Sequence, residues 1–298
     1  MKIIIAGGSG YLGKCLIQHY LETTDACIYI LSRIHALDSK RVKHLVWDGK
    51  DFGYWLEFLE GADLLINLSG KSVNCRYTSE NKQKLYASRL ESTSILCRAV
   101  ECLQHPPKVF IQMSSATIYK HTLAHKNTET NGLIGSDFSM DLCKKWEQVF
   151  DTYHFERTKK IILRTALVLG NKGGVYPELK KIINMGFGLR HGPGNQMVSW
   201  ISEQDFVEGI DHIITQKEGI YNLCAPNPIK NKEFLQALNQ NIKPIIKLPL
   251  PSWLIQIGTY FKQTEAELVL KSRFVYPEKL LKSGYRFKNP FITNFNLS

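Results

Sequence analysis

A glycine-rich turn near the start of the chain constrains the fold more than any other feature. Residues 3–13 read Ile-Ile-Ile-Ala-Gly-Gly-Ser-Gly-Tyr-Leu-Gly, which places Gly7, Gly10 and Gly13 directly after a short apolar strand and at the opening of a helix. These glycines allow a tight turn, close approach of a phosphate to the backbone, and close packing of helix on strand. The helix N-terminus adds unpaired N–H groups and a partial positive charge. The segment predicts a dinucleotide pyrophosphate site, whose loop also contains Ser9, Tyr11 and Leu12.

Short apolar runs alternate with helical patterns after this turn. The predicted strands are rich in Ile, Leu or Val and cover Lys2–Ala6, Cys27–Leu31, Asp63–Asn67, Lys108–Met113 and Lys160–Leu163. The predicted helices cover Tyr11–Leu21, Trp55–Leu59, Ser79–Leu103 and Asp137–Tyr153. Such alternation is typical of a parallel sheet with helices on both faces. We therefore predict an α/β fold with a doubly wound parallel Rossmann sheet.

The character of the chain changes after Gly170, where glycines and prolines become frequent. We expect residues 1–170 to form a dinucleotide-binding Rossmann domain. A predicted helix over Asp205–Thr215 and a predicted strand over Gly219–Leu223 indicate that residues 197–224 return to it. Residues 171–196 and 225–298 then form a smaller C-terminal region for substrate.

Composition excludes several other classes of protein. The chain has 298 residues, 44% hydrophobic and 22% charged, as in an ordinary globular protein. Its longest uncharged run, Leu248–Phe261, is too short for a membrane helix, and the apolar start is too short for a secretory signal. The seven scattered cysteines contain no Cys-x-x-Cys pair. We expect a cytoplasmic protein with no membrane partner, no disulfide framework and no metal site.

The formal net charge of +11 is compatible with nucleic acid, an anionic membrane or an anionic ligand. The basic residues, however, are spread along the chain with nothing denser than doublets, and no nucleic-acid-binding signature accompanies them. We therefore expect a small-molecule substrate and no nucleic acid.

The end of the second predicted strand bears on the choice of nucleotide. The chain reads Ser32-Arg33 there, and no carboxylate follows until Asp38. An NAD site usually places a carboxylate at this point to accept from the ribose 2′-hydroxyl, whereas a guanidinium suits a 2′-phosphate. These residues predict NADP as the cofactor; the alternative is that Arg33 is a solvated loop residue.

Several further segments resemble the extended short-chain dehydrogenase/reductase superfamily, the NAD(P)-dependent epimerase/dehydratases. They follow the third, fourth and fifth predicted strands and are Asn67–Gly70, Ser114–Tyr119 and Leu163–Gly170. The resemblance implies cofactor contacts from the strand ends, at Leu68, Ser69, Gly70, Ser114, Thr165 and Leu167. Other stretches, among them Ser88–Thr93, Cys143–Glu147 and Tyr221–Pro228, are similar to the atypical epimerase-like family of class 39U. Residues Leu248–Phe287 resemble the short C-terminal extension of that family. The chain departs from the family at Ser202, where histidine is common.

Catalysis in that superfamily uses a Tyr-x-x-x-Lys pair on one helix face, where the lysine lowers the tyrosine pKa. The corresponding positions here are Ser139 and Cys143, so the pair is absent. Cys143 is either a nucleophile or a small apolar filler of the helix. The sole Tyr-x-x-x-Lys of the chain, Tyr176 to Lys180, lies after the fifth strand and is better interpreted as a helix start with Pro177 in its first turn.

Two other residues are candidates for catalysis. The resemblance implies that Ser115 hydrogen-bonds the reacting oxygen; the alternative is a serine that satisfies the backbone at a strand end. Tyr119 could supply a phenol, although packing is the more frequent role at such a position. The basic, glycine-rich stretch from Arg190 to Gly194 either lines a pocket for an anionic or sugar-like substrate or is a solvated loop.

Two functions remain open on the sequence. The first is an NADP-dependent epimerase-like oxidoreductase that acts on a small hydroxyl or carbonyl compound. The retained Ser115 favours this function. The second is a catalytically silent NADP(H)-binding regulatory protein, which the absence of the Tyr-x-x-x-Lys pair favours.

Overall fold

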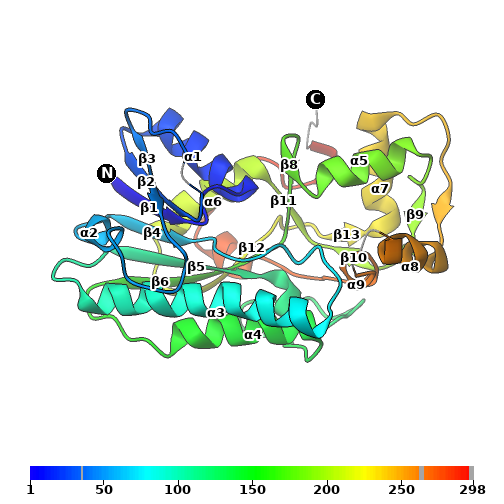
Figure 1. The fold of residues 1–298 in the computed structure, drawn as a ribbon. Coiled ribbons are helices and arrows are strands. Elements are labelled where there is room, and N and C mark those ends of the chain that lie inside the picture. Colours follow the sequence, from blue (N-terminus) through cyan, green and yellow to red (C-terminus); the bar gives the residue numbers. More distant parts are fainter. Residues whose placement is uncertain (35, 262–264, 295–298) are drawn as a thin grey trace.

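A seven-stranded parallel sheet forms the centre of the molecule (Figure 1). The structure, a computed structural model, describes residues 1–34, 36–261 and 265–294. The strand order is β12-β6-β5-β4-β1-β2-β3. The strands are β1 (Lys2–Ala6), β2 (Cys27–Ser32), β3 (Val42–Val46), β4 (Leu64–Asn67), β5 (Val109–Ser115), β6 (Lys159–Thr165) and β12 (Gly219–Leu223). The order reverses direction at β1, which places a topological switch point beside the glycine-rich turn.

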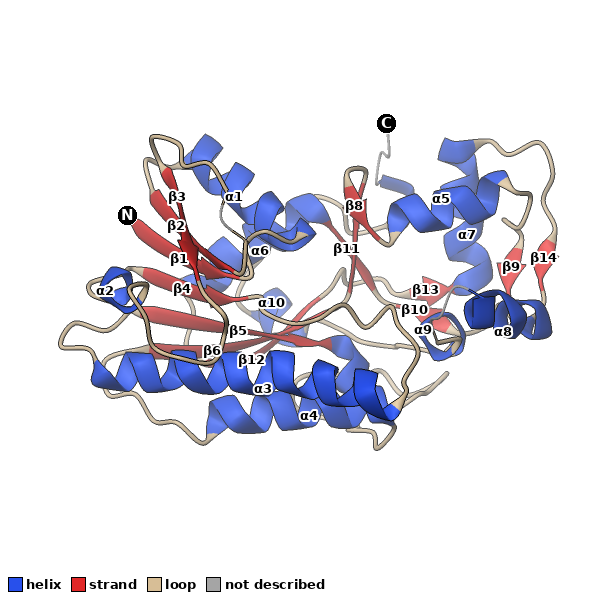
Figure 2. Cartoon of the chain, in the orientation of Figure 1, coloured by secondary structure: helices blue, strands red, loops and turns tan. Residues whose placement is uncertain are grey.

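Helices cover both faces of this sheet (Figure 2). The helices α1 (Tyr11–Thr23) and α6 (Glu203–Ile214) lie on one face, and α3 (Ser79–Cys102) and α4 (Phe138–Asp151) lie on the other. Successive side chains of a strand point to opposite faces. Ile3 and Ile5 accordingly pack with α1 and α6, whereas Ile4 packs with α3 and α4. Burial on both faces explains why these strands are continuous apolar runs. The predicted doubly wound α/β fold is confirmed.

A smaller lobe follows β7 (Leu167–Gly170) and holds its own apolar cluster, centred on Trp200, Phe234 and Leu238. Its helices are α5 (Tyr176–Asn184), α7 (Asn231–Ile242), α8 (Ser252–Phe261) and α9 (Glu267–Leu270). Its strands are β8 (Gly173–Gly174), β9 (Arg190–His191), β10 (Met197–Val198), β11 (Trp200–Ser202), β13 (Ile229–Lys230) and β14 (Pro249–Leu250). The chain returns to the main sheet between them, since β12 pairs in parallel with β6.

The C-terminal segment, residues 265–294, crosses the carboxyl edge of the sheet and contains α10 (Glu278–Lys282) and the 3₁₀ turn η2 (Ile292–Asn294). Its backbone pairs with Asn127, which accepts from Tyr276 N–H at 2.9 Å and donates to the Phe274 carbonyl at 2.8 Å. The Ser199 hydroxyl donates to the Arg273 carbonyl at 2.7 Å. These contacts fix the segment against loops from both lobes. The short α2 (Leu56–Leu59) lies at the opposite end of the sheet (Figure 1).

None of the helices in the described part of the chain has the length and apolar character needed to cross a membrane.

The buried carboxylate of Asp205 anchors the end of the C-terminal segment. It accepts hydrogen bonds from Lys288 N–H at 2.7 Å, Asn289 N–H at 2.9 Å, and the hydroxyls of Ser202 and Tyr285 at 2.8 and 3.2 Å. Ser202 also caps α6 by accepting from Asp205 N–H. Ser202 therefore has a clear structural role, because it caps the helix whose Asp205 binds the end of the C-terminal segment.

We predict that Asp205→Ala lowers the free energy of unfolding by about 3 kcal/mol, because it leaves two partly buried backbone N–H groups and two hydroxyls without their charged acceptor. Denaturant unfolding measures this change. Asp211→Ala on the same helix is the control; it removes a half-exposed carboxylate paired with His19 at 2.6 Å and should cost less than about 1 kcal/mol. Equal losses in the two variants would contradict the anchoring role.

Candidate functional site

The three glycines of the turn have three different surroundings. Gly7 has a φ of +76°, and a Cβ there would lie 3.0 Å from the backbone of Ser69. A Cβ on Gly13 would lie 2.4 Å from the Gly8 carbonyl oxygen, so helix and turn touch as predicted. Gly10 differs, because a Cβ there would meet only the Gly7 carbonyl oxygen, at an ordinary 3.5 Å. The missing side chain at Gly10 thus leaves open space rather than relieving a clash inside the protein.

The N-terminus of α1 is free to bind an anion. Gly10 occupies the cap position, no side chain caps the helix, and its first turn holds no acidic residue. Ser9 and Gly10 are exposed. Unpaired N–H groups at a helix start favour a negatively charged partner. The arrangement fits a pyrophosphate in front of α1.

Tyr11 and Leu12 shape this loop from inside. The Tyr11 hydroxyl donates to Glu203 at 2.7 Å, and the glycines of β8 pack against its ring, since a Cβ on Gly173 would lie 2.4 Å from it. Leu12 packs against the core. The two side chains therefore support the turn and connect it to α6.

The carboxyl end of β2 presents one cation. Arg33 is exposed and forms no hydrogen bond or ion pair with any residue that the structure describes. Ser32 is buried and its hydroxyl donates to the Ile34 carbonyl at 2.6 Å, so it is used locally. Asp38 accepts from His44 N–H at 2.8 Å on β3. At this strand end, the guanidinium of Arg33 therefore has N–H donors that no described residue uses.

The end of β4 lies against the glycine turn. The buried Asn67 side chain donates to Gln112 at 2.9 Å and accepts from Ser69 N–H at 3.0 Å, which fixes the backbone of Leu68 and Ser69. The Ser69 hydroxyl is buried without a hydrogen-bond partner among the described residues. A Cβ on Gly70 would lie 3.0 Å from the guanidinium of Arg89. The structure thus brings together the predicted cofactor-binding residues that follow β1 and β4.

A buried polar network occupies the space between β5, β6 and α4. Glu147 accepts from Arg164 at 2.9 and 2.7 Å, and from the Ser114 hydroxyl at 2.5 Å. The Tyr119 hydroxyl accepts from Arg164 at 2.9 Å and lies 2.8 Å from the Asn222 side-chain oxygen. Ser114 can therefore reach a cofactor only through its backbone. Tyr119 has no exposed surface, and burial raises its pKa, so this geometry gives the phenol a structural role.

Ser115 lies at the carboxyl end of β5 and is half-buried. Its hydroxyl donates to the Thr117 hydroxyl at 3.0 Å and accepts from Thr117 N–H, which caps the 3₁₀ turn η1 (Ala116–Ile118). Both the capping role and a contact with substrate are compatible with this position. On β6, the buried Thr165 donates to the sulfur of Met113 at 3.6 Å, and the partly buried Leu167 begins β7.

The positions of the absent catalytic pair are buried. Ser139 and Cys143 lie four residues apart on α4, with exposed fractions of 4% and 6%. Burial raises the pKa of the Cys143 thiol to about 12, so it is protonated at neutral pH and is a poor nucleophile. Tyr176 begins α5 with a proline in its first turn, as predicted; Tyr176 is buried and Lys180 is exposed, so they do not form a pair.

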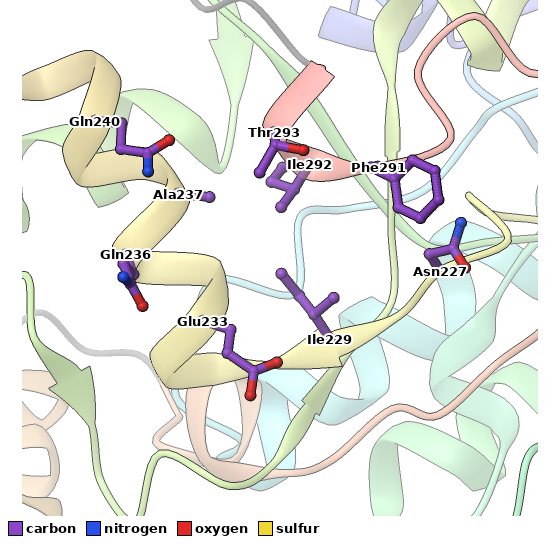
Figure 3. Close-up of a pocket in the computed structure, with 9 residues that line it drawn as sticks. All are labelled: Asn227, Ile229, Glu233, Gln236, Ala237, Gln240, Phe291, Ile292 and Thr293. Atoms are coloured by element: carbon purple, nitrogen blue, oxygen red, sulfur yellow. The ribbon is translucent and has the colours of Figure 1, made fainter.

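Two further regions with polar side chains lie in the smaller lobe. His191 is buried and its ring lies 3.0 Å from the Phe187 carbonyl, whereas Arg190 is exposed. A hollow of about 290 Å³ lies between α7 and the chain end, and Figure 3 shows that Gln236 and Gln240 border it opposite Phe291. None of the predicted site residues lines it. Within the described ranges, no three His, Cys, Asp or Glu side chains are grouped so as to hold a metal ion.

Sequence reasoning missed Tyr77 and Arg273. The Tyr77 hydroxyl is buried without a hydrogen-bond partner among the described residues, and its ring packs on Phe138 at the start of α4. Arg273 follows Lys271 in the C-terminal segment, and Lys271 pairs at 2.6 Å with Asp137, the residue at the N-cap position of α4. No local spacing connects residues so far apart in the chain.

Comparisons with known proteins agree with this architecture. The sequence model of the NAD dependent epimerase/dehydratase family matches residues 3–224, and that of a domain of unknown function, DUF1731, matches residues 250–294. An epimerase family protein of Staphylococcus saprophyticus is 28% identical over 96% of this chain and 95% of its own.

Solved structures share the fold. The human epimerase family protein SDR39U1, solved with NADPH, superposes with a TM-score of 0.85 at 24% identity and covers 99% of this chain and 97% of its own. UDP-glucose 4-epimerase of Thermus thermophilus, solved with NAD, has a TM-score of 0.75 at 16% identity and covers 100% and 97%.

We predict that Gly10→Val leaves the protein folded and abolishes dinucleotide binding, because the side chain fills space that only a ligand would use. Calorimetric titration with NADPH and thermal unfolding measure the two effects. The matched variant Gly13→Val should instead unfold the protein, since its Cβ would overlap the Gly8 backbone. Unchanged NADPH affinity in folded Gly10→Val would contradict the site.

Proposed function

The chain belongs to the NAD dependent epimerase/dehydratase family, and from that premise we propose that it is an NADP-dependent, epimerase-like oxidoreductase acting on a small hydroxyl or carbonyl compound. The observation that carries the proposal is the uncapped N-terminus of α1 in front of an open Gly10, with the unpaired Arg33 at the neighbouring strand end. NADP supplies a hydride donor or acceptor when bound. The residues of this chain hold it and position the substrate.

NADP rather than NAD is favoured by charge at the end of β2. A guanidinium donates two parallel hydrogen bonds to a phosphate, and the structure leaves Arg33 exposed and without a carboxylate partner among the described residues. The nearest carboxylate in sequence, Asp38, is held by His44 N–H. The NADPH in the human relative's structure supports the same choice.

The substrate oxygen is assigned to Ser115. This hydroxyl is half-buried at the carboxyl edge of the sheet, where ligands of open α/β sheets bind. Without a Tyr-x-x-x-Lys pair, Ser115 orients the oxygen while water or another group exchanges the proton. We place cofactor binding in residues 1–170 with 197–224, and substrate binding in residues 171–196 and 225–298. The free cysteines support a cytoplasmic location.

The second candidate is an NADP(H)-binding protein that regulates a partner without turnover. Ser139 and Cys143 favour it, because neither buried side chain can replace a phenol and an ammonium in proton transfer. The two candidates share the cofactor site and differ only in whether NADPH is consumed.

We predict that Arg33→Ala weakens NADPH binding about 10–100-fold, equivalent to about 1.5–3 kcal/mol for a charge-assisted contact, and changes NADH binding less than about twofold. Calorimetry with each nucleotide measures this. The control is Lys43→Ala, which removes an exposed cation from the first half of the neighbouring strand β3, away from the carboxyl end of β2. It should change the affinity for neither nucleotide. NADH binding to the unaltered protein as tightly as NADPH would refute the assignment.

We also predict NADPH oxidation with at least one member of a panel of small aldehydes and ketones. Ser115→Ala should then lower kcat about 100-fold, the usual cost of removing one donor to a developing oxyanion. Thr117→Val is the control, since it removes the hydroxyl partner of Ser115 and keeps Ser115 itself. Tight NADPH binding with no oxidation across the panel would favour the regulatory candidate.

A further inference from the structure

Two arginines from distant parts of the chain lie beside α4 without carboxylate partners. Arg89 of α3 donates to the carbonyls of Lys71 and Leu85 at 3.0 and 3.3 Å, and its guanidinium lies 5.0 Å from the ring centre of Trp146. Arg273 of the C-terminal segment donates to the adjacent Ser272 carbonyl at 3.1 Å. Neither forms an ion pair with a described residue. Burial lowers the pKa of both, yet a guanidinium remains charged.

The two arginines lie near the same stretch of α4. Arg89 packs on Trp146, three residues after Cys143 on that helix, and both guanidinium charges oppose the rise that burial causes in the pKa of the Cys143 thiol. Cys143 packs in one apolar cluster with Ala116, the residue after Ser115, and with Val275 of the C-terminal segment. The arginines therefore flank the end of β5 where substrate binding is proposed.

Unsatisfied hydroxyls lie in the same place. Ser139 is more than nine-tenths buried, and its Oγ has no hydrogen-bond partner among the described residues. It is on the same helix face as Cys143, since residues four apart are neighbours on a helix. The buried Tyr77 hydroxyl is likewise unpartnered. Buried donors of this kind are costly unless a ligand or water completes them.

The local charges also leave room for an anion. Lys271 pairs with both Asp137 and Glu267, at 2.6 and 2.5 Å, so one ammonium serves two carboxylates. Glu265, which accepts from Tyr77 N–H at 2.7 Å, pairs with Arg76 at 3.8 Å. Arg89 and Arg273 therefore bring the cations of this group to four against three carboxylates. One negative charge would balance the group.

Building on the proposed function, we propose that Arg89 and Arg273 bind an oxyanion of the substrate, a carboxylate or a phosphate, with the Ser139 and Tyr77 hydroxyls as further donors. Guanidinium groups fit both anions through paired hydrogen bonds. The C-terminal segment, matched by a domain of unknown function, then has a specific role: it carries Arg273 to the carboxyl edge and completes the substrate site.

Calorimetric titration of the protein tests this. NADPH is titrated first; oxalate and inorganic phosphate are then each titrated twice, once in the presence and once in the absence of NADPH. We expect one of the two probes to bind, and its identity distinguishes a carboxylate from a phosphate. Arg273→Met and Arg89→Met should each weaken that probe tenfold or more, and Arg273→Met should leave the NADPH affinity within threefold. Arg157→Met, which removes an exposed arginine before the amino end of β6, should change neither.

The outcomes separate the two proposals. If Arg89→Met does not fold, Arg89→Lys replaces it, because lysine keeps the charge and loses the paired geometry, and weaker probe binding is still expected. Failure of NADPH to bind the unaltered protein would overturn the proposed function, while the titrations without NADPH still decide the oxyanion site. Absence of binding by both probes, or equal binding to unaltered protein and Arg273→Met, would overturn the inference.

Discussion

The buried ion pair between Glu147 and Arg164 is the interaction on which the rest of the structure depends. It joins α4 to β6, and its remaining hydrogen bonds extend to Ser114 on β5 and Tyr119 after it. Tyr119 continues the network to Asn222 on β12, whose side chain donates to the Tyr276 carbonyl at 3.0 Å. A buried pair of this kind is costly to break, by about 3–5 kcal/mol when one partner is lost. The network therefore fixes the carboxyl edge of the sheet and the C-terminal segment relative to each other.

This network also explains how the site can lack a catalytic pair and remain ordered. In a Tyr-x-x-x-Lys enzyme, the helix that corresponds to α4 supplies the tyrosine and lysine for proton transfer. Here the same helix presents Ser139 and Cys143, while its Glu147 is fully used by internal partners. In the proposed site, positive charge comes instead from Arg89 on α3 and Arg273 on the C-terminal segment. The proposed substrate site thus draws on α3 of the Rossmann domain as well as on the C-terminal segment.

The parts of the fold that local patterns encode could be predicted from the sequence. The glycine turn, the buried strands such as Lys2–Ala6 and the long helix from Ser79 carry strong periodicity, and the structure places them within a few residues of the prediction. The sequence analysis did not predict the edge strand Val42–Val46, because Lys43 and His44 interrupt its apolar residues and leave neither a continuous apolar run nor a strict alternation. The two-residue strands of the smaller lobe carry no period at all. Burial of Tyr119 and the convergence of Arg89 with Arg273 depend on tertiary packing, which no local spacing reveals.

The position of Arg273 near the end of the chain has a consequence for biosynthesis. The glycine turn and the strands that surround it lie in the first part of the chain and emerge first from the ribosome. Domains generally fold as units during synthesis, starting from the N-terminus. The residues of the proposed nucleotide site are therefore synthesised before Arg273 and before the segment that Asp205 holds. A chain that ends before Arg273 therefore contains the residues of the proposed nucleotide site and lacks one of the two arginines of the proposed oxyanion site.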